Sequence, residues 1–350
     1  MNNTGVMQPF LDKKDGYVVA VVGATGAVGE TMLDILAERK FPVSDLIPVA
    51  SSRSAGSKIT FNGKDYTVQD LATFDPTGVD IALFSAGGGT SKAYAPKFAE
   101  VGCYVVDNSS AWRMDEDIAL VVPEVNPHAL EMARENHIIA NPNCSTIQMV
   151  VALKPLHDVV PIERVVVSTY QAVSGAGGKA MDELAKQTGA LLNGQEAKVD
   201  VFPARIAFNV IPHIDVFMDD GYTKEERKMM DETCKILESD IAVTATTVRV
   251  PVFYSHSESV NITFSGQMSA NQARDLLADA DGICVVDDPS GEDYPLASEA
   301  SGSDSVWVGR IRDDKSYPNS LHLWVVADNV RKGAALNAVQ IAEILIRQPK

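Results

Sequence analysis

The sequence predicts an α/β protein with two domains: a doubly wound parallel sheet, followed by an α+β domain whose sheet is mostly antiparallel. Three observations support this prediction. The chain has 350 residues, more than the roughly 250–300 at which a single hydrophobic core stops growing. Strand-like and helix-like segments alternate over the first 143 residues, which is typical of a parallel sheet. Near residue 145 this alternation ends and the segments follow a different order.

The first domain begins with a strand and a glycine-rich turn. Residues 17–22 are a continuous apolar run, as expected of a strand buried on both faces, and residues 30–39 carry apolar side chains at helical spacing. Further strand-like runs lie at 46–50, 80–84, 104–107 and 138–140, with a helical stretch at 91–101. This order favours a dinucleotide-binding domain, which we place at residues 17–143. Residues 1–16 are interpreted as a loose leader.

The second domain, placed at 144–330, mixes long helices with β-rich runs. The expected helices are 179–192 and 223–238, and the expected strands are 164–170, 246–252, 259–265 and 321–326. Residues 331–347 then form a strongly amphipathic helical pattern. We expect this last helix to return to the first domain and pack against it.

The composition excludes several classes of protein. Thirty Lys and Arg against 47 Asp and Glu give a formal charge of −17, which argues against a nucleic-acid or anionic membrane partner. No apolar stretch approaches the ~18 residues of a membrane span, and no secretory signal is visible. The four cysteines are scattered without metal-ligand spacing, so we expect reduced thiols, a cytoplasmic location and no metal site.

The glycine-rich turn has the chemistry of a dinucleotide site. Gly23, Gly26 and Gly29 lie between a strand and a helix, where a backbone without side chains and an open helix N-terminus suit a pyrophosphate. After the second strand, where an NAD enzyme usually has an acid, the chain has Ser51, Arg53 and Ser54 instead. These side chains favour the 2′-phosphate of NADP. The alternatives are a tight turn without ligand and a solvated loop.

A cysteine and a histidine are candidates for covalent catalysis. Cys144 follows Asn143 directly before an apolar helical run, so we expect it at a helix N-terminus, where the helix dipole favours a thiolate. A thiolate can add to a carbonyl. His256 lies between two expected strands and is the candidate acid/base. Sequence spacing does not show that these residues meet, and a small buried cysteine and a structural histidine are the alternatives.

Six segments in order resemble the aspartate-β-semialdehyde dehydrogenase family from about Val18 to about Glu343. The segments that carry the resemblance are 23–29, 108–113, 141–146, 171–177, 249–258 and 328–335. A short insert at 221–226 resembles the Gram-positive-like branch of the bacterial enzymes. The resemblance implies a Rossmann-like first domain and a second domain that combines catalysis with dimerisation.

The resemblance also implies a role for each matching residue. Cys144 would be the nucleophile, His256 the acid/base, and Gln171 would orient the acyl group. Arg249 would bind the substrate α-carboxylate and Glu225 the α-ammonium, while Arg113 and Lys228 would hold the phosphate. For the last three, ordinary surface ion pairs are the alternative. The cofactor contacts would be Gly23, Thr25, Gly26, Ala27 and Val28 along the pyrophosphate, Ser51, Arg53 and Ser54 near the 2′-phosphate, and Ser174, Gly175 and Asn329 at the nicotinamide.

The implied reaction is the reversible, NADPH-dependent reductive dephosphorylation of 4-phospho-L-aspartate to aspartate semialdehyde through a cysteine thioester. Its product would supply the diaminopimelate route to lysine and the methionine and threonine branches, and the enzyme would be a homodimer or homotetramer with inorganic phosphate as co-substrate. Alternatives are an N-acetyl-γ-glutamyl-phosphate reductase, a malonyl-CoA reductase, a glyceraldehyde-phosphate dehydrogenase and a non-catalytic dinucleotide-binding sensor.

Overall fold

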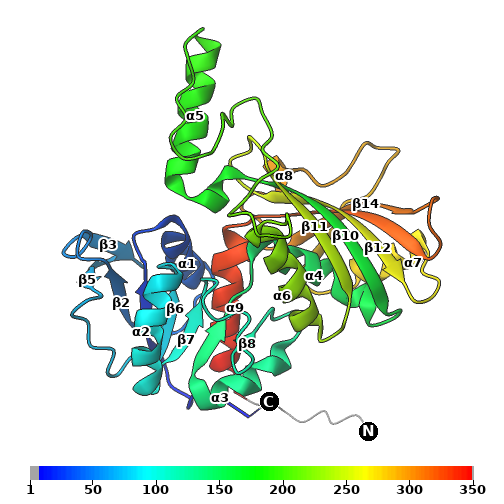
Figure 1. Ribbon diagram of the computed structural model, residues 1–350. Helices are drawn as coiled ribbons and strands as arrows, with labels where there is room; N and C mark the ends of the chain where they lie inside the picture. Colours follow the sequence, from blue (N-terminus) through cyan, green and yellow to red (C-terminus); the bar gives the residue numbers. More distant parts are fainter. Residues whose placement is uncertain (1–7, 349–350) are drawn as a thin grey trace. The chain divides into compact units, whose positions relative to one another are not determined.

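The chain divides after Pro142 and again after Gly333. The computed structural model describes residues 8–348 (Figure 1). The first unit consists of the described residues up to Pro142 together with those from Ala334 onward, and the second unit is Asn143–Gly333.

A seven-stranded sheet forms the centre of the first unit, with the order β5-β2-β1-β6-β7-β9-β8. The strands are β1 (Tyr17–Val22), β2 (Val43–Ala50), β5 (Gln69–Asp70), β6 (Ile81–Phe84), β7 (Tyr104–Asp107), β8 (Ala119–Leu120) and β9 (Ile138–Ala140). All neighbouring strands are parallel. The predicted parallel sheet is therefore confirmed. A hairpin of β3 (Lys58–Phe61) and β4 (Lys64–Thr67) follows β2 and was not expected from the sequence.

Helices cover both faces of this sheet. On one face lie α1 (Ala27–Glu38) and α9 (Leu336–Leu345), whose apolar residues share one buried cluster with the strands. On the other face, Phe98 of α2 (Gly88–Glu100) packs edge-on against Phe84 of β6. The short α3 (Ala133–Asn136) precedes β9. The expected C-terminal helix thus packs on the first unit, although it begins as a π-helical turn at Arg331–Ala335 and its regular part ends at Leu345.

Residues 8–16 pack on the first unit, whereas the sequence analysis interpreted them as part of a loose leader. Phe10 and Leu11 lie against the apolar cluster, and the Arg134 guanidinium lies 4.0 Å from the centre of the Phe10 ring. The Leu11 amide donates to the carbonyl oxygen of Leu345 at 3.3 Å. An aromatic ring and a leucine among polar residues gave too little periodicity to predict this packing. The remaining leader residues, 1–7, lie outside the described residues.

A six-stranded mixed sheet forms the second unit, in the order β11-β10-β12-β15-β14-β13. Its strands are β10 (Ile162–Gln171), β11 (Ala242–Arg249), β12 (His256–Phe264), β13 (Ile283–Val285), β14 (Val306–Asp313) and β15 (Ser320–Ala327). Three of its neighbouring pairs are antiparallel and two are parallel. The strand expected at 246–252 ends at Arg249, because Pro251 cannot donate to a ladder.

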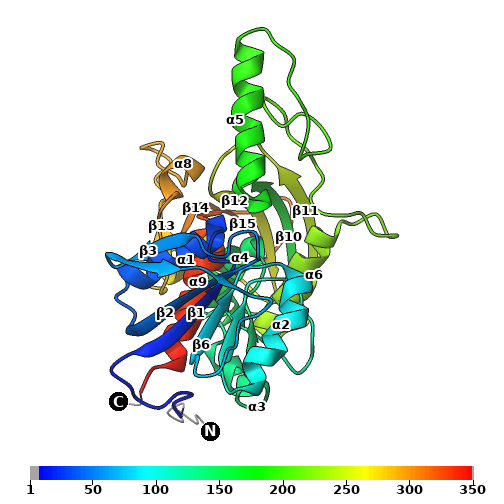
Figure 2. The same cartoon turned by 90° about the vertical axis from the view of Figure 1, so that its left-hand side faces the viewer.

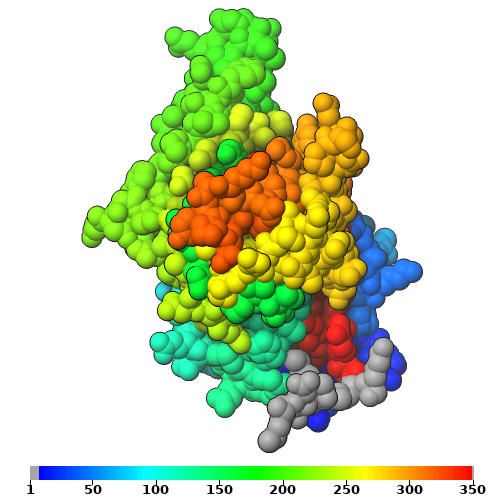
Figure 3. Space-filling model, turned by 90° about the vertical axis from the view of Figure 1, so that its right-hand side faces the viewer, coloured from blue at the N-terminus to red at the C-terminus, as the bar shows by residue number. Residues whose placement is uncertain are grey.

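One face of this mixed sheet is covered by helices. They are α4 (Cys144–His157), α6 (Lys224–Leu237) and α7 (Ala270–Ala278). The short α8 (Ala297–Ala300) contacts β15. On the uncovered face, the Tyr170 ring packs at a tilt of 47° against Trp324, with ring centres 5.4 Å apart, and Tyr170 is 39% exposed. Figure 3 shows residues near β14, in orange, reaching the surface of this unit.

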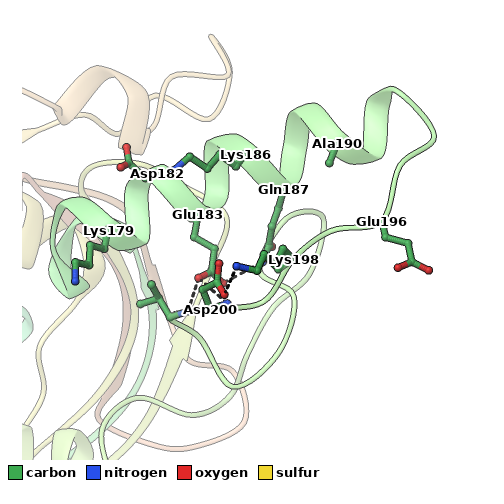
Figure 4. A pocket seen from close by; sticks show the side chains of 10 residues that line it. Lys179, Asp182, Glu183, Lys186, Gln187, Ala190, Glu196, Lys198 and Asp200 are labelled. Atoms are coloured by element: carbon green, nitrogen blue, oxygen red, sulfur yellow. Dashed lines mark hydrogen bonds and ion pairs between the residues drawn. The ribbon is translucent and has the colours of Figure 1, made fainter.

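The helix α5 (Gly178–Leu192) projects from the second unit, with its following loop beside it (Figures 1 and 2). Two buried side chains of α5 hold this loop, as Figure 4 shows. Glu183 accepts from the amides of Asp200 and Val201, and Gln187 accepts from the amides of Ile206 and Ala207. The pocket beside α5 is therefore lined by residues that stabilise the loop.

Candidate active site

The second unit begins with an asparagine-capped helix that carries the candidate nucleophile. Cys144 is the first residue of α4, as the sequence predicts. The Oδ1 atom of Asn143 accepts from the amides of Ser145 at 3.0 Å and Thr146 at 3.2 Å. This cap satisfies two amides at the helix N-terminus and fixes the direction of the first turn, and with it the position of Cys144.

Asn143 is itself held from two sides by glutamates of α6. Its backbone amide donates to Oε2 of Glu232 at 2.7 Å, and its Nδ2 donates to Oε1 of Glu225 at 2.8 Å. Sequence reasoning missed Asn143 and Glu232 as positioning residues. A polar residue before a helix signals only the cap, whereas the link to α6 comes from the tertiary fold.

Glu225 is a buried, ionised carboxylate. Besides Asn143, it accepts from Nε2 of Gln171 at 3.2 Å and from Nζ of Lys228 at 3.0 Å. Burial alone would raise its pKa, but the Lys228 charge and the three hydrogen-bonding side chains lower the pKa of Glu225 to about 2. Lys228 also donates to Asp215 at 2.8 Å. The predicted pair on one helix face therefore exists, and Asp215 is an additional partner that the sequence did not indicate.

His256 and Gln171 lie together at the ends of adjacent antiparallel strands. Their Nε2 atoms are 3.5 Å apart, and the Oε1 atom of Gln171 accepts from the hydroxyl of Thr169 at 3.0 Å. The amide of Ala172 donates to Nδ1 of His256 at 3.0 Å. Because Nδ1 is occupied as an acceptor, the neutral ring carries its proton on Nε2, which is the atom beside Gln171.

The same residue, Ala172, also holds Arg249. Nη1 of Arg249 donates to the carbonyl oxygen of Ala172 at 2.7 Å. Burial lowers the pKa of this guanidinium, while Glu225 and Cys144 act in the opposite direction. Cys144 is therefore close enough to Arg249 to interact electrostatically. The backbone of one residue thus orients both Arg249 and His256.

Two glycines allow close approaches around these groups. A Cβ atom on Gly175 would lie 3.1 Å from Nη1 of Arg249 and 3.3 Å from the His256 ring. A Cβ atom on Gly333 would lie 2.9 Å from Cβ of Cys144. Larger residues at either position would displace the neighbouring side chains. Gly333 was inside a segment of the resemblance, but its contact with Cys144 was not predicted.

The expected nicotinamide contacts lie in the same unit. The Ser174 hydroxyl donates to Oδ1 of Asn329 at 3.1 Å, and that oxygen also accepts from the amide of Ser255 at 3.0 Å. Nine of the predicted site residues therefore lie in the second unit. They are Cys144, Gln171, Ser174, Gly175, Glu225, Lys228, Arg249, His256 and Asn329.

The glycine-rich turn in the first unit fits a pyrophosphate. Gly23 has φ +88°, and a Cβ atom there would lie 2.4 Å from the carbonyl oxygen of Ser85. A Cβ atom on Gly29 would lie 2.2 Å from the carbonyl oxygen of Gly23, so the strand and α1 pack closely. Gly26 is the N-cap of α1, and within residues 8–348 no side chain caps it. The amides that begin α1, at Ala27 and Val28, therefore face outward for an anion.

A cavity of about 480 Å³ adjoins this turn. Its lining includes Gly23, Thr25, Gly26 and residues 51–54, so the predicted loop after β2 does face the turn. The Thr25 hydroxyl donates to Oγ of Ser54 at 3.3 Å, and Arg53 is exposed. One acid that sequence analysis did not consider, Asp70, also lines the cavity, where it accepts from the amide of Ala72. The residues present fit a dinucleotide with a 2′-phosphate.

Arg113 belongs to the first unit. Its Nε donates to the carbonyl oxygen of Asn141 and its Nη2 to that of Asn108, both at 3.0 Å. Arg113 as a whole is 7% exposed. Asn141 also donates to Oδ1 of Asn108 at 2.7 Å. Arg113 is therefore fixed by main-chain carbonyls of two segments from the resemblance.

Among residues 8–348, no helix is long and apolar enough to cross a membrane. Within the same residues, no cluster of three His, Cys, Asp or Glu side chains is arranged to hold a metal ion.

Two family models match the chain. The model described as "Semialdehyde dehydrogenase, NAD binding domain" matches residues 18–133, and the one described as "Semialdehyde dehydrogenase, dimerisation domain" matches residues 153–332. Among curated relatives, aspartate-semialdehyde dehydrogenase of Aquifex aeolicus is 58% identical over 95% of this chain and 99% of its own. The enzyme of Bacillus subtilis is 51% identical over 94% of this chain and 97% of its own.

Solved structures that are similar to this chain are also aspartate semialdehyde dehydrogenases. Aspartate semialdehyde dehydrogenase II from Vibrio cholerae, also solved in a complex described as "with ASA", has a TM-score of 0.93 and 55% identity. The match covers 95% of this chain and 99% of that one. A Candida albicans aspartate semialdehyde dehydrogenase solved with NADP has a TM-score of 0.74 and 26% identity, covering 94% and 98% of the two chains.

We expect His256 to stay neutral through the physiological pH range. Burial, and next the Arg249 charge, lower its pKa to about 3, while Glu225 acts in the opposite direction. Since the unfolded chain takes up this proton near pH 6.5, the stability that the neutral ring contributes falls as the pH drops from about 6.5 toward 3. Nitrogen-15 NMR of the ligand-free protein should show one Nε2–H tautomer from pH 5 to pH 8. A protonation midpoint near 6.5, lost in His256→Gln, would contradict this assignment.

Proposed function

The chain belongs to the aspartate-semialdehyde dehydrogenase family, and from this we propose that it interconverts 4-phospho-L-aspartate and L-aspartate 4-semialdehyde. In the biosynthetic direction the acyl phosphate is reduced and inorganic phosphate is released. The product enters the lysine, methionine and threonine branches of amino-acid synthesis. The observation that carries this proposal is the convergence, within one unit, of a cysteine at a helix N-terminus with Arg249, Glu225, Gln171 and His256.

Three charged residues of the second unit suit the substrate. Arg249, buried and hydrogen-bonded on one side by Ala172, presents a planar guanidinium for the α-carboxylate. Glu225 remains ionised and so can accept the α-ammonium. Lys228, whose pKa is raised by Glu225 and Asp215 despite burial, binds the phosphate as a cation. In the first unit, Arg113 is the further phosphate ligand.

Cys144 carries the covalent chemistry in this proposal. Its thiolate attacks the acyl carbon, the C–S bond forms, and the C–O bond to phosphate breaks, leaving a thioester. Gln171, fixed by Thr169 and Glu225, orients the acyl group. The Nε2–H of His256 donates to the acyl oxygen as negative charge develops there. Hydride addition to the thioester leaves a thiohemiacetal alkoxide, to which the Nε2–H of neutral His256 donates a hydrogen bond. When this alkoxide collapses, the C=O bond forms, the C–S bond breaks, and the thiolate of Cys144 is restored.

NADPH, when bound, supplies the hydride that reduces the thioester to the thiohemiacetal. Thr25, Gly26, Ala27 and Val28 hold the pyrophosphate at the start of α1. Ser51, Arg53 and Ser54 bind the 2′-phosphate, and the Ser174–Asn329 pair with Gly175 forms the nicotinamide side of the site. The solved relative with NADP supports this choice of coenzyme.

We further propose a homodimer that uses the uncovered face of the mixed sheet. Residues 153–332 match a dimerisation domain, and Tyr170 and Trp324 expose aromatic surface on that face. Arg310 and Arg312 line a cavity beside Trp324 and supply the polar edge of such an interface. We place the reaction in the cytoplasm, where the scattered cysteines stay reduced.

Replacing Cys144 tests the reaction directly. Phosphate-dependent reduction of NADP should occur with aspartate semialdehyde and not with N-acetylglutamate semialdehyde, which has no free ammonium for Glu225. Cys144→Ala should lose this turnover completely while it binds NADP as well as the parent enzyme. Cys234→Ala is the matched control and should keep full activity. Persistent turnover in Cys144→Ala, or a preference for the acetylated substrate, would refute the proposed function.

Coenzyme preference tests the loop after β2. Because Arg53 is exposed, Arg53→Ala should raise the KM for NADP by only a few-fold to about tenfold, with little effect on NAD. Arg53→Asp should change the preference further, because a carboxylate repels the phosphate. Steady-state kinetics with both coenzymes would measure this. An unchanged NADP-to-NAD ratio in Arg53→Asp would show that the loop is only a solvated turn.

Sedimentation equilibrium tests the proposed interface. The parent protein should sediment as a dimer, whereas Trp324→Arg should shift it toward monomer by placing a charge on the uncovered face. Phe253→Ala, another exposed aromatic change outside that sheet, should leave the dimer intact. A monomeric parent, or a dimer unaffected by Trp324→Arg, would place the contact elsewhere, and a tetramer would require a second surface.

A further inference from the structure

Two buried polar residues, Gln148 and Glu258, follow Cys144 and His256 on the same elements. On α4, Gln148 is four residues after Cys144, and on β12, Glu258 is two residues after His256. These spacings place each follower on the same face as its predecessor. Both Gln148 and Glu258 have 0% exposure, so neither contacts solvent. The reaction proposed above uses neither residue.

Gln148 connects the nucleophile helix to the main chain of His256. Its Nε2 donates to the carbonyl oxygens of His256 at 3.3 Å and Val325 at 3.5 Å. These two contacts fix the direction of the amide, because only the nitrogen of a glutamine side chain can donate to a carbonyl oxygen. The Oε1 atom of Gln148 therefore points away from them. It is buried and, among the described residues, has no hydrogen-bond donor.

The carboxyl group of Glu258 can supply that donor when it is protonated. Both of its oxygens are buried without a hydrogen-bond partner among residues 8–348. Its register neighbours are Thr169 on β10 and Val325 on β15. The Thr169 hydroxyl donates to Gln171 and accepts from the amide of Val248, and Val325 is apolar, so neither supplies a hydrogen bond to a carboxylate.

The charge state of Glu258 follows from these surroundings. Burial raises its pKa well above the ordinary value, and the nearby Gln148 amide acts against this effect. An ionised carboxylate would lack donors here, whereas a carboxylic acid brings its own. The titratable groups nearest the reacting end of the surrounding elements are His256 on β12, which is neutral, and Cys144 on α4. The other titratable groups on α4, β10 and β15 do not shift the pKa of Glu258; they are Lys154, His157, Glu163, Arg164, Tyr170 and His322. Its register neighbours on β10 and β15 carry no charge.

We propose that Glu258 is a positioning residue: as a neutral carboxylic acid it donates to Oε1 of Gln148 and so locks α4 to the main chain of His256. The lock sets the spacing between Cys144 at the start of α4 and His256 at the start of β12. This inference rests on the proposed function, because that spacing matters only if the two residues act on one substrate.

Two substitutions at Glu258 separate a neutral donor from an anion. Glu258→Gln keeps the shape and an N–H donor, so kcat should stay within about twofold of the parent with the same pH profile. Glu258→Leu has a similar volume but leaves Oε1 of Gln148 without a donor. Its kcat should fall roughly tenfold or more, while the KM for semialdehyde and the NADP affinity change less than threefold. The pH dependence of the rate at which Cys144 is alkylated should shift in Glu258→Leu and stay unchanged in Glu258→Gln.

Several outcomes would overturn the proposal. Equal damage in both variants would mean that an anion is needed at this position, and an undamaged Glu258→Leu would mean that no lock exists. If Glu258→Leu does not fold, infrared difference spectra of the parent minus Glu258→Gln still decide. They should show the C=O band of a protonated carboxyl at neutral pH, and a carboxylate band would refute the proposal. The infrared and alkylation measurements do not require turnover, so a failed semialdehyde assay would count against the proposed function alone.

Discussion

The cap at the start of α4 is the interaction on which the rest of the candidate site depends. One asparagine fixes the first turn of α4 with its oxygen, and it contacts Glu225 with its nitrogen and Glu232 with its backbone. Through Glu225 the same network extends to Gln171 and Lys228. Cys144, Gln171, Glu225 and Lys228 are therefore held by one connected set of hydrogen bonds rather than by separate supports.

The site balances buried charges so that each group keeps a defined protonation state. Glu225 stays ionised because several donors and the Lys228 charge compensate for burial, whereas Glu258 has no comparable partners and its pKa rises. His256, buried near the Arg249 charge, is held neutral. Three titratable groups in one unit thus differ in state because their immediate neighbours differ. Such differences between neighbouring groups are typical of sites that move protons.

Local signals in the sequence predicted the parallel sheet, the glycine-rich turn and the position of Cys144, because each depends on residues adjacent in the chain. The family resemblance is confirmed by relatives that cover nearly the whole chain. The contacts of Asn143 with α6, of Ala172 with both Arg249 and His256, and of Gly333 with Cys144 were not predictable. They join segments far apart in sequence, and no local periodicity encodes them. The packing of Phe10 and Leu11 was missed for the same reason.

The position of α9 has a consequence for how the protein is made. Leu336, Val339 and Ile341 complete the apolar core of a unit whose strands are all encoded before residue 141. A chain emerging from the ribosome therefore exposes an incomplete first core until residues 336–345 have been released. The second unit is continuous and can close first, since domains fold as units during synthesis. The first core can therefore be completed after the second unit has closed, although most of its residues are translated earlier.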